Sequence, residues 1–137
     1  MRPVAALPLL CAIVTLSACG PAPTDSSTSF TGEKAKVAKT IEDFSAATLK
    51  RDQTKLCRYL TVRSAKLVQD RRRKPCADAL QDLVGAATDR GLTVQTVTIT
   101  GDAAKATVTV PNAEKSDRGT LTLRREAGAW KIDLTGR

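Results

Sequence analysis

The chain has no histidine and few aromatic side chains. The first absence removes the commonest general base and the commonest nitrogen ligand of zinc. Aromatic residues make up only 3% of the 137 residues, which argues against base-stacking surfaces for single-stranded nucleic acid. The glycines are scattered singly, so no phosphate-binding loop is present, and no nucleophile has a recognisable base. We therefore predict no catalytic residue, no metal site and no cofactor, and an enzyme is the least supported class.

The composition that remains suits one small domain. Charged residues are 26% and apolar residues 42% of the chain, as in an ordinary folded protein rather than a disordered one. The formal net charge is +8. This excess of basic residues makes an anionic partner the first possibility to consider.

The first eighteen residues have the layout of an export signal. Arg2 supplies a positive charge, and residues 4–16 form a mainly apolar run. This run is too short to cross a bilayer, which takes about 20 helical residues. A charged start, a short apolar core and small residues after it are typical of a secretory signal peptide, so residues 1–18 are predicted to be removed. A buried N-terminal helix is the weaker alternative, because Pro3 and Pro8 would interrupt it.

The end of this segment, Leu16-Ser17-Ala18-Cys19, resembles a bacterial lipobox. In that family the cysteine thiol receives a diacylglycerol thioether, and a signal peptidase then cuts just before it. The resemblance implies that Cys19 is lipidated and anchors the protein to the cell membrane on its extracytoplasmic face. Ordinary secretion with cleavage after Ala18 is the main alternative, and a structural role for Cys19 is the third.

The remaining cysteines then form a simple pair. If Cys11 leaves with the signal peptide and Cys19 carries lipid, the mature domain keeps Cys57 and Cys76. One pair in an exported protein indicates one disulfide. Closing a loop of this length stabilises the folded protein by roughly 3 kcal/mol. A redox-active pair is the alternative, but catalytic cysteines usually lie in a Cys-x-x-Cys motif at the start of a helix.

The mature chain begins with a tether and continues into helices. Residues 19–32 are rich in Pro, Ser and Thr and are predicted to be a flexible tether, with Phe30 as the place where the chain first docks. Apolar residues at helical spacing predict a helix over 33–50. Asp52 can cap a second helix, residues 64–69 suit a short helical turn, and Pro75 suits the first position of a third helix.

The rest of the chain predicts an antiparallel sheet. Alternating apolar residues indicate strands within 92–100, 103–110, 120–126 and 129–134, with Gly101-Asp102 and Ala127-Gly128 as turns. The pattern points Val97, Ile99 and Leu134, among others, to the inner face. Only one face of such a sheet is apolar, so the helices are expected to cover it. Residues 33–137 are therefore predicted to be an α+β domain, with N-terminal helices packed on a four-stranded antiparallel sheet.

This order of elements resembles the NTF2-like, cystatin-like superfamily. Arg51-Asp52 and the segment "LCRYL" at 56–60 match a pattern common after the first helix of its small secreted members, and "GAWKI" at 128–132 matches their ending. The resemblance implies a cone, a bent sheet wrapped by helices, whose hollow relatives use for small ligands or catalysis. Tyr59 and Trp130 would line such a pocket, although these residue types are more often part of a core. The resemblance departs at 61–68, where an extra short strand is usual in the family and this sequence does not suit one.

The strongest charge feature is Arg71-Arg72-Arg73-Lys74, with Arg58, Arg63 and Lys66 upstream. One interpretation is a patch that binds anionic phospholipid headgroups or acidic wall polymer. The other is a solvated loop between helices, as most charge runs are. The export signal argues against nucleic acid as the partner.

Together these features favour a lipid-anchored, non-catalytic binding or scaffold domain of the bacterial cell envelope. Its expected partners are the membrane, through the lipid anchor, and an anionic lipid, a wall polymer or an envelope protein. A small-molecule carrier that uses the hollow of the cone is the alternative. A carrier requires a cavity of at least about 300 Å³ behind the sheet.

Overall fold

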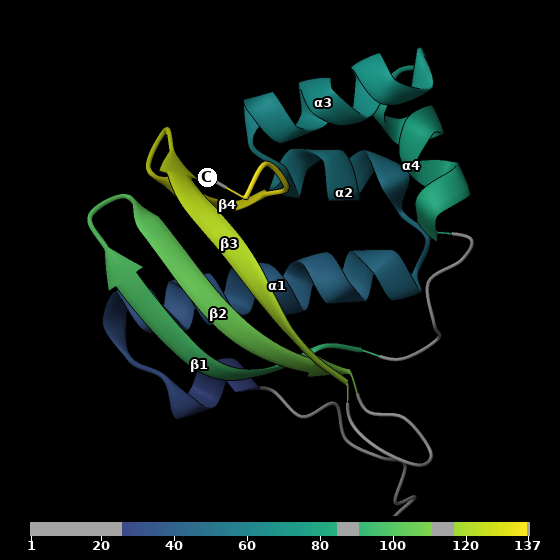
Figure 1. Cartoon of the computed structure of the whole chain (residues 1–137). Helices are drawn as coiled ribbons and strands as arrows, with labels where there is room; N and C mark the ends of the chain where they lie inside the picture. Colours follow the sequence, from purple (N-terminus) through teal and green to yellow (C-terminus); the bar gives the residue numbers. More distant parts are fainter. Residues whose placement is uncertain (1–25, 85–90, 111–116, 137) are drawn as a thin grey trace, which may run out of the picture.

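The computed structural model describes residues 26–84, 91–110 and 117–136. The predicted signal peptide, Cys19 and most of the predicted tether lie outside these residues. Four helices precede four strands along the chain (Figure 1). They follow a short 3-10 helix, and the elements are η1 (Ser26–Ser29), α1 (Gly32–Leu49), α2 (Gln53–Tyr59), α3 (Val62–Arg72), α4 (Cys76–Val84), β1 (Thr93–Thr100), β2 (Ala103–Val110), β3 (Asp117–Glu126) and β4 (Ala129–Asp133). Among the described residues, no helix is both long enough and apolar enough to cross a membrane.

The strands form one antiparallel sheet in the order β1-β2-β3-β4. The predicted turns connect them: Thr100 lies opposite Ala103, and Glu126 lies opposite Ala129. Ala127 and Gly128 both have positive φ, 48° and 79°, which is the backbone of a tight primed hairpin turn. The α+β architecture predicted from the sequence is therefore confirmed.

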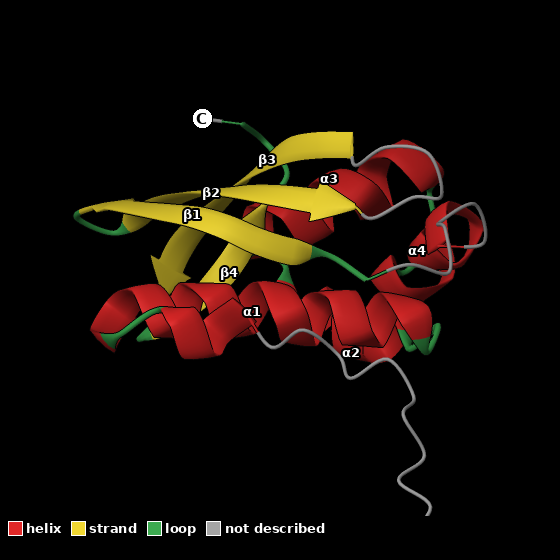
Figure 2. Cartoon of the chain, turned by 90° about the horizontal axis from the view of Figure 1, so that it is seen from below, coloured by secondary structure: helices red, strands yellow, loops and turns green. Residues whose placement is uncertain are grey.

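Helix α1 lies beneath the sheet and covers its inner face (Figure 2). Its side chains at positions three and four apart, Val37, Ala38 and Ile41, are completely buried against the strands. The core between the layers also contains Leu56, Leu60, Val68, Ala79, Leu80, Val94, Val97, Ala104, Ala106, Val108, Leu123, Trp130 and Ile132. Burial of one helix face against one sheet face is what holds the two layers together.

The strands differ from the predicted pattern in two details, although Val97 and Ile99 lie on the inner face as predicted. The pairing of β1 shifts between Val94 and Thr96, so a bulge at Gln95 breaks the alternation and both Val94 and Val97 are buried. At the other end of the sheet, β4 ends at Asp133, one residue earlier than predicted. Leu134 therefore leaves the strand and is 46% exposed instead of facing inward.

Residues 62–68 are helical, and α3 is longer than the short turn predicted there. Just before it, Leu60 makes a single parallel bridge to Ile132, and the Thr61 amide donates to the Ile132 carbonyl at 2.9 Å. One bridge followed by a helix thus stands where the family pattern has a short strand. The helix also extends through Arg72, so half of the predicted basic loop belongs to its last turn.

The α2–α4 pair is joined covalently. Cys57 and Cys76 form a disulfide with an S–S distance of 2.14 Å and a Cα–Cα distance of 6.1 Å, which confirms the predicted pairing. The bond links α2 to the first residue of α4. Asp52 caps α2 as predicted, since its carboxylate accepts a hydrogen bond from the Lys55 amide at 2.9 Å.

Candidate functional site

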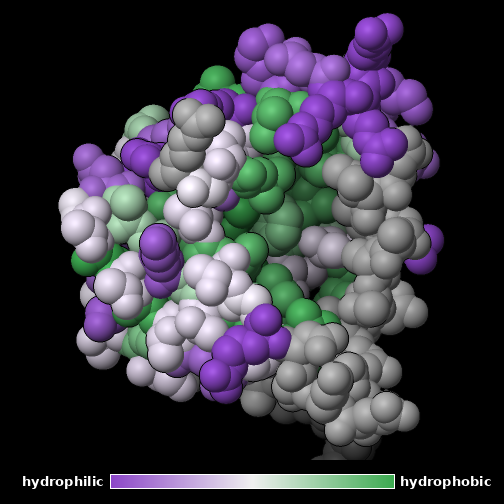
Figure 3. All heavy atoms as spheres, viewed as in Figure 1, coloured by the Kyte–Doolittle hydropathy of each residue, from purple (hydrophilic) through white to green (hydrophobic). Residues whose placement is uncertain are grey.

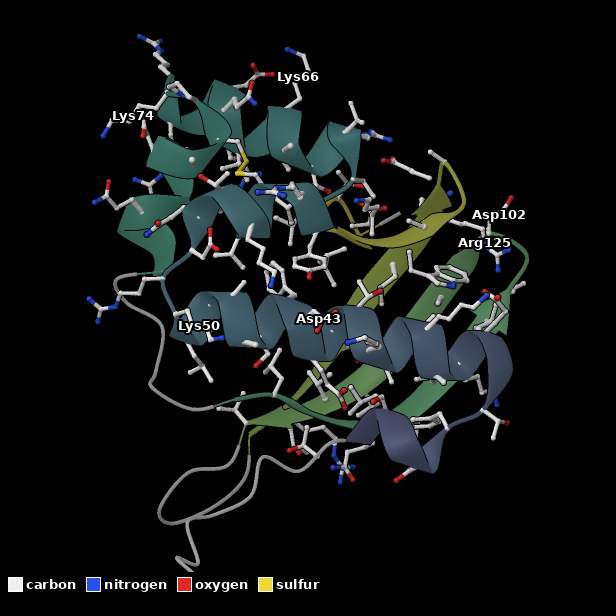
Figure 4. The ribbon with its side chains drawn as sticks, turned by 180° about the vertical axis from the view of Figure 1, so that it is seen from behind. Asp43, Lys50, Lys66, Lys74, Asp102 and Arg125 are labelled. Carbon is white, nitrogen blue, oxygen red and sulfur yellow. A yellow bond between two sulfur atoms is a disulfide. The ribbon has the colours of Figure 1, made fainter. Side chains whose placement is uncertain are left out.

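The most basic exposed region of the described structure lies on α3 and the residues just after it. It comprises Arg63, Lys66, Arg71, Arg72, Arg73 and Lys74, all exposed, and is called the α3 basic surface below. The only acid in this stretch is Asp70. Hydrophilic side chains gather over this end of the molecule in Figure 3, and Lys66 and Lys74 extend from the side of α3 and α4 that is turned away from α1 in Figure 4.

Three open hollows follow α3 and meet this surface. The first has a volume of about 230 Å³ and is lined by Thr61, Arg63, Arg124, Glu126 and Asp133. The second, of about 380 Å³, is lined by Arg63, Lys66, Leu67, Asp70, Arg71, Leu134 and Thr135. The third, of about 570 Å³, is lined by Gln69, Asp70, Arg73, Lys74 and Pro75. Neighbouring hollows share Arg63 or Asp70, so they form a row, called the α3 groove below.

A buried hydroxyl pair fixes the start of α3. The Thr61 hydroxyl caps the helix by accepting a hydrogen bond from the Ser64 amide at 3.1 Å, and it donates to the Ser64 hydroxyl oxygen at 2.7 Å. Ser64 is fully buried, and its Oγ also accepts a hydrogen bond from the Leu134 amide at 2.8 Å. These bonds attach the first turn of α3 to the chain just after β4.

Asp133 completes this attachment from the end of β4. Its Oδ1 accepts hydrogen bonds from the Thr135 amide at 2.9 Å, the Thr135 hydroxyl at 2.6 Å and the Ser64 hydroxyl at 3.3 Å. Its Oδ2 lies 3.3 Å from Nε of Arg124. Burial by itself would raise the pKa of Asp133, but the hydrogen bonds from Thr135, Ser64 and Arg124 outweigh it and lower the pKa below its ordinary value. Asp133 is therefore charged, and it holds Ser64, Thr135 and Arg124 in place beside the groove.

The other end of α3 is held by its backbone and its charges. Arg71 and Arg72 lie in the last turn, where positive charge interacts favourably with the helix dipole. Arg73 ends the helix in the left-handed conformation, with φ of 53°. The chain then reaches Cys76, whose disulfide fixes α4 to α2. The basic residues thus have a structural role at this helix end in addition to any binding role.

The structure separates Tyr59 and Trp130 from this groove, and neither residue lines one of the three hollows. Trp130 is 5% exposed, and its indole Nε1 donates to Glu33 Oε2 at 3.0 Å. Tyr59 is half-buried between helices, and burial, with a smaller contribution from the charge of Asp43, raises the pKa of its phenol. Both residues pack in or against the hydrophobic core.

Trp130 belongs to a polar cluster that the sequence analysis missed. Nη2 of Arg125 lies 2.8 Å from Glu33 Oε2, and the Arg125 guanidinium lies 4.8 Å from the centroid of the Trp130 ring. Hydrogen bonds from Lys36 and then from Trp130 lower the pKa of Glu33. A signal for this cluster was present, because Arg125 continues the inward series of Leu121 and Leu123. An arginine at an inward position requires a partner, and α1 supplies it.

The sequence analysis also missed the residues that α3 meets at the end of the sheet, Arg124 and Asp133. They face the opposite side of the sheet from Leu123, and only the packing of α3 against the chain end makes this place a site. Within the residues that the structure describes, no group of three or more acidic or cysteine side chains is placed to hold a metal ion.

No family model matches the chain, and no curated protein matches it. Among solved structures, a Campylobacter jejuni protein provisionally assigned as an NTF2-like transpeptidase aligns with a TM-score of 0.52 at 18% identity, over 71% of this chain and 96% of its own. The fold is NTF2-like. An NTF2-like protein of unknown function from Silicibacter pomeroyi aligns with a TM-score of 0.50 at 19% identity, over 72% of this chain and 87% of its own. At these identities the NTF2-like domain shares an architecture with the two proteins, and the activity of neither carries over.

Proposed function

We propose that this NTF2-like domain is a lipid-anchored, non-catalytic binding or scaffold domain on the extracytoplasmic side of a bacterial cell membrane. Its α3 basic surface binds an anionic component of the envelope. The observation that carries this proposal is the concentration of six basic side chains and one acid along a single exposed helix and the turn after it. Five of these basic side chains, all except Arg72, line a row of open hollows.

All six basic side chains of this surface are exposed to solvent. The ion pair of Lys66 with Asp70, at 3.3 Å, has side chains that are 73% and 62% exposed, so water and salt screen it strongly. Each basic residue held near an anionic surface contributes about 1 kcal/mol of binding free energy, which falls off within about 10 Å at ordinary salt. Several such residues in one turn of chain are enough for measurable, salt-sensitive binding.

The anchor is proposed from the lipobox-like sequence that ends in Cys19. A Cys19→Ser variant of the full chain should be released from membranes into the soluble fraction, because it has no thiol to accept the lipid. A Cys11→Ala variant is the matched control, since it changes a cysteine of the same leader and keeps the lipobox. Release of both variants, or of neither, contradicts the proposed anchor.

The binding surface is tested on the released Cys19→Ser protein with vesicles of phosphatidylglycerol and with inorganic polyphosphate as probes. Changing Arg71, Arg72, Arg73 and Lys74 to Gln should weaken binding at least about tenfold. The control changes four exposed lysines elsewhere to Gln: Lys34, Lys50, Lys55 and Lys105. It removes the same charge and should cost less than about threefold. Equal losses in the two variants, or no salt-sensitive binding by the starting protein, overturn the proposal.

A small-molecule carrier is the second candidate. It is favoured by the apolar side chains that line a hollow beside the α3 end of the molecule in Figure 3. A carrier should retain a small apolar molecule through purification, visible as an added mass in native mass spectrometry. This ligand should be unaffected by the four substitutions in the α3 basic surface. If the four substitutions abolish both the retained ligand and polyanion binding, the carrier site is not separate from the α3 basic surface, and this candidate is contradicted.

A further inference from the structure

The place where the chain enters the domain is fixed by η1. The Ser27 amide donates to Glu42 Oε1 on α1 at 2.5 Å, and Phe30 packs half-buried against the core. The η1 segment contacts α1 and β1. Residues 26–31 therefore belong to the folded body, and the chain that can separate it from a lipid on Cys19 is only the stretch between residues 19 and 26.

The entry point and the α3 basic surface lie at opposite ends of the molecule (Figures 1 and 4). α1 lies between η1 and α2, and α3 lies on the far side of α2. Contacts agree with this order, since η1 contacts α1, α1 contacts α2, and α3 contacts α4 and β4. The distance between η1 and α3 in space is at least the distance seen in a picture, so the two elements are well separated.

The length of the connecting chain decides which way α3 faces. The seven residue steps from Cys19 to Ser26 span at most about 25 Å when fully extended. A compact domain of about 110 residues has a radius of gyration of about 13 Å and hence a diameter of about 34 Å, and η1 and α3 lie at its opposite ends. With η1 docked, the outer face of α3 cannot lie flat on the bilayer that holds Cys19.

We infer that the α3 basic surface faces away from the anchoring membrane and binds a linear polyanion, a wall polymer with repeated phosphate or carboxylate groups. This inference rests on the proposed lipidation of Cys19. The shape of the site supports a polymer: the three hollows share lining residues and follow a helix of 11 residues, about 16 Å long. A row of this kind suits charges that repeat along a chain better than a single lipid headgroup. The anchor thus places the domain to hold the membrane and the wall polymer at its two ends.

The orientation is tested on the full lipidated protein, purified from membranes and reconstituted in phosphatidylcholine vesicles with an energy-transfer acceptor on the headgroups. One fluorophore is attached through Ser29→Cys in η1 and, in a second variant, through Gln69→Cys on α3, both exposed positions. We expect more efficient transfer from position 29 than from position 69, with phosphatidylglycerol in the vesicles leaving that order unchanged. If transfer from position 69 equals or exceeds transfer from position 29, with or without phosphatidylglycerol, the inference is overturned. If this happens only with phosphatidylglycerol, the anionic lipid is the partner of the α3 basic surface.

The ligand is tested on the same vesicles with inorganic polyphosphate added from outside. The four Gln substitutions at 71–74 should weaken its binding at least about tenfold, and the lysine control at 34, 50, 55 and 105 should change it less than about threefold. Unchanged binding in the 71–74 variant overturns the inference and leaves the anchor intact. If the starting protein does not enter the vesicles at all, the lipid anchor of the proposed function fails, and the orientation fails with it.

Discussion

Asp133 is the residue whose removal should most clearly reveal how α3 is held. Its side chain is only 4% exposed. Oδ1 accepts three hydrogen bonds, and Oδ2 forms an ion pair with Nε of Arg124. Asp133→Asn keeps the shape and Oδ1 but places an NH₂ donor against the Arg124 donor. Loss of one charge-assisted hydrogen bond in a buried place costs about 2 kcal/mol, so we expect the free energy of unfolding at neutral pH to fall by about that amount.

The pH dependence of this loss follows from the pKa of Asp133. The folded-state pKa lies below the ordinary value of 3.8, so the charged carboxylate stabilises the fold at every pH above that value. This contribution disappears as the pH falls through the folded-state pKa, when the folded protein also takes up the proton. The difference in stability between the starting protein and Asp133→Asn should therefore be constant near neutrality and shrink below about pH 4.

The assay is urea unfolding with the disulfide intact, followed by fluorescence of Trp130, the only tryptophan in the chain. The control is Asp70→Asn, the same chemical change at a carboxylate that is 62% exposed and paired with Lys66, where a loss below about 0.5 kcal/mol is expected. A loss below about 0.5 kcal/mol for Asp133→Asn at neutral pH would refute the reasoning, because it lies in the range of an exposed pair. A stability difference that stays constant down to about pH 2.5 would refute the pH argument.

Three further substitutions test the rest of the fold by the same urea assay. Ala127→Gly should raise the free energy of unfolding by about 0.5–1 kcal/mol, because Ala127 has a positive φ of 48° that glycine adopts without strain; a loss of stability would contradict this. Replacing Cys57 and Cys76 together by Ser should lower it by about 3 kcal/mol, since the bond closes a loop with a sequence separation of 19, and no change would show that the disulfide is dispensable. Leu123→Ala should lower it by about 2–5 kcal/mol, because Leu123 is completely buried between sheet and helices, and a loss under about 1 kcal/mol would mean that the core closes around the gap.

Much of the fold was predictable because its signals are local. Periods of 3.6 and 2 residues distinguished helices from strands, Asp52 marked the start of α2, and Gly101 and Gly128 marked the hairpins. The differences from the predicted pattern occur where a segment distant in sequence packs against the strand and changes its local geometry. The bulge at Gln95 depends on how β1 pairs with β2, and Leu134 leaves the sheet because α3 captures the chain just after β4.

The candidate site divides in the same way. The basic residues at 71–74 were visible in the sequence as a charge run, because charge is a property of the side chain itself. The groove beside them was not visible, since Arg124 and Asp133 are more than 50 residues from α3 and meet it only by folding. Likewise, alternation put Arg125 on the inner face, but only α1 could bring Glu33 to meet it.

The sequence by itself indicated most of the elements, their order, the pairing of Cys57 with Cys76 and the amount of positive charge. These follow from spacing and composition, which are fixed along the chain. Only the tertiary structure decided that η1 and the α3 basic surface lie at opposite ends of the domain. That separation depends on how α1 packs against η1 and α2, and how α3 packs against α4 and β4, and packing joins residues that no local pattern relates.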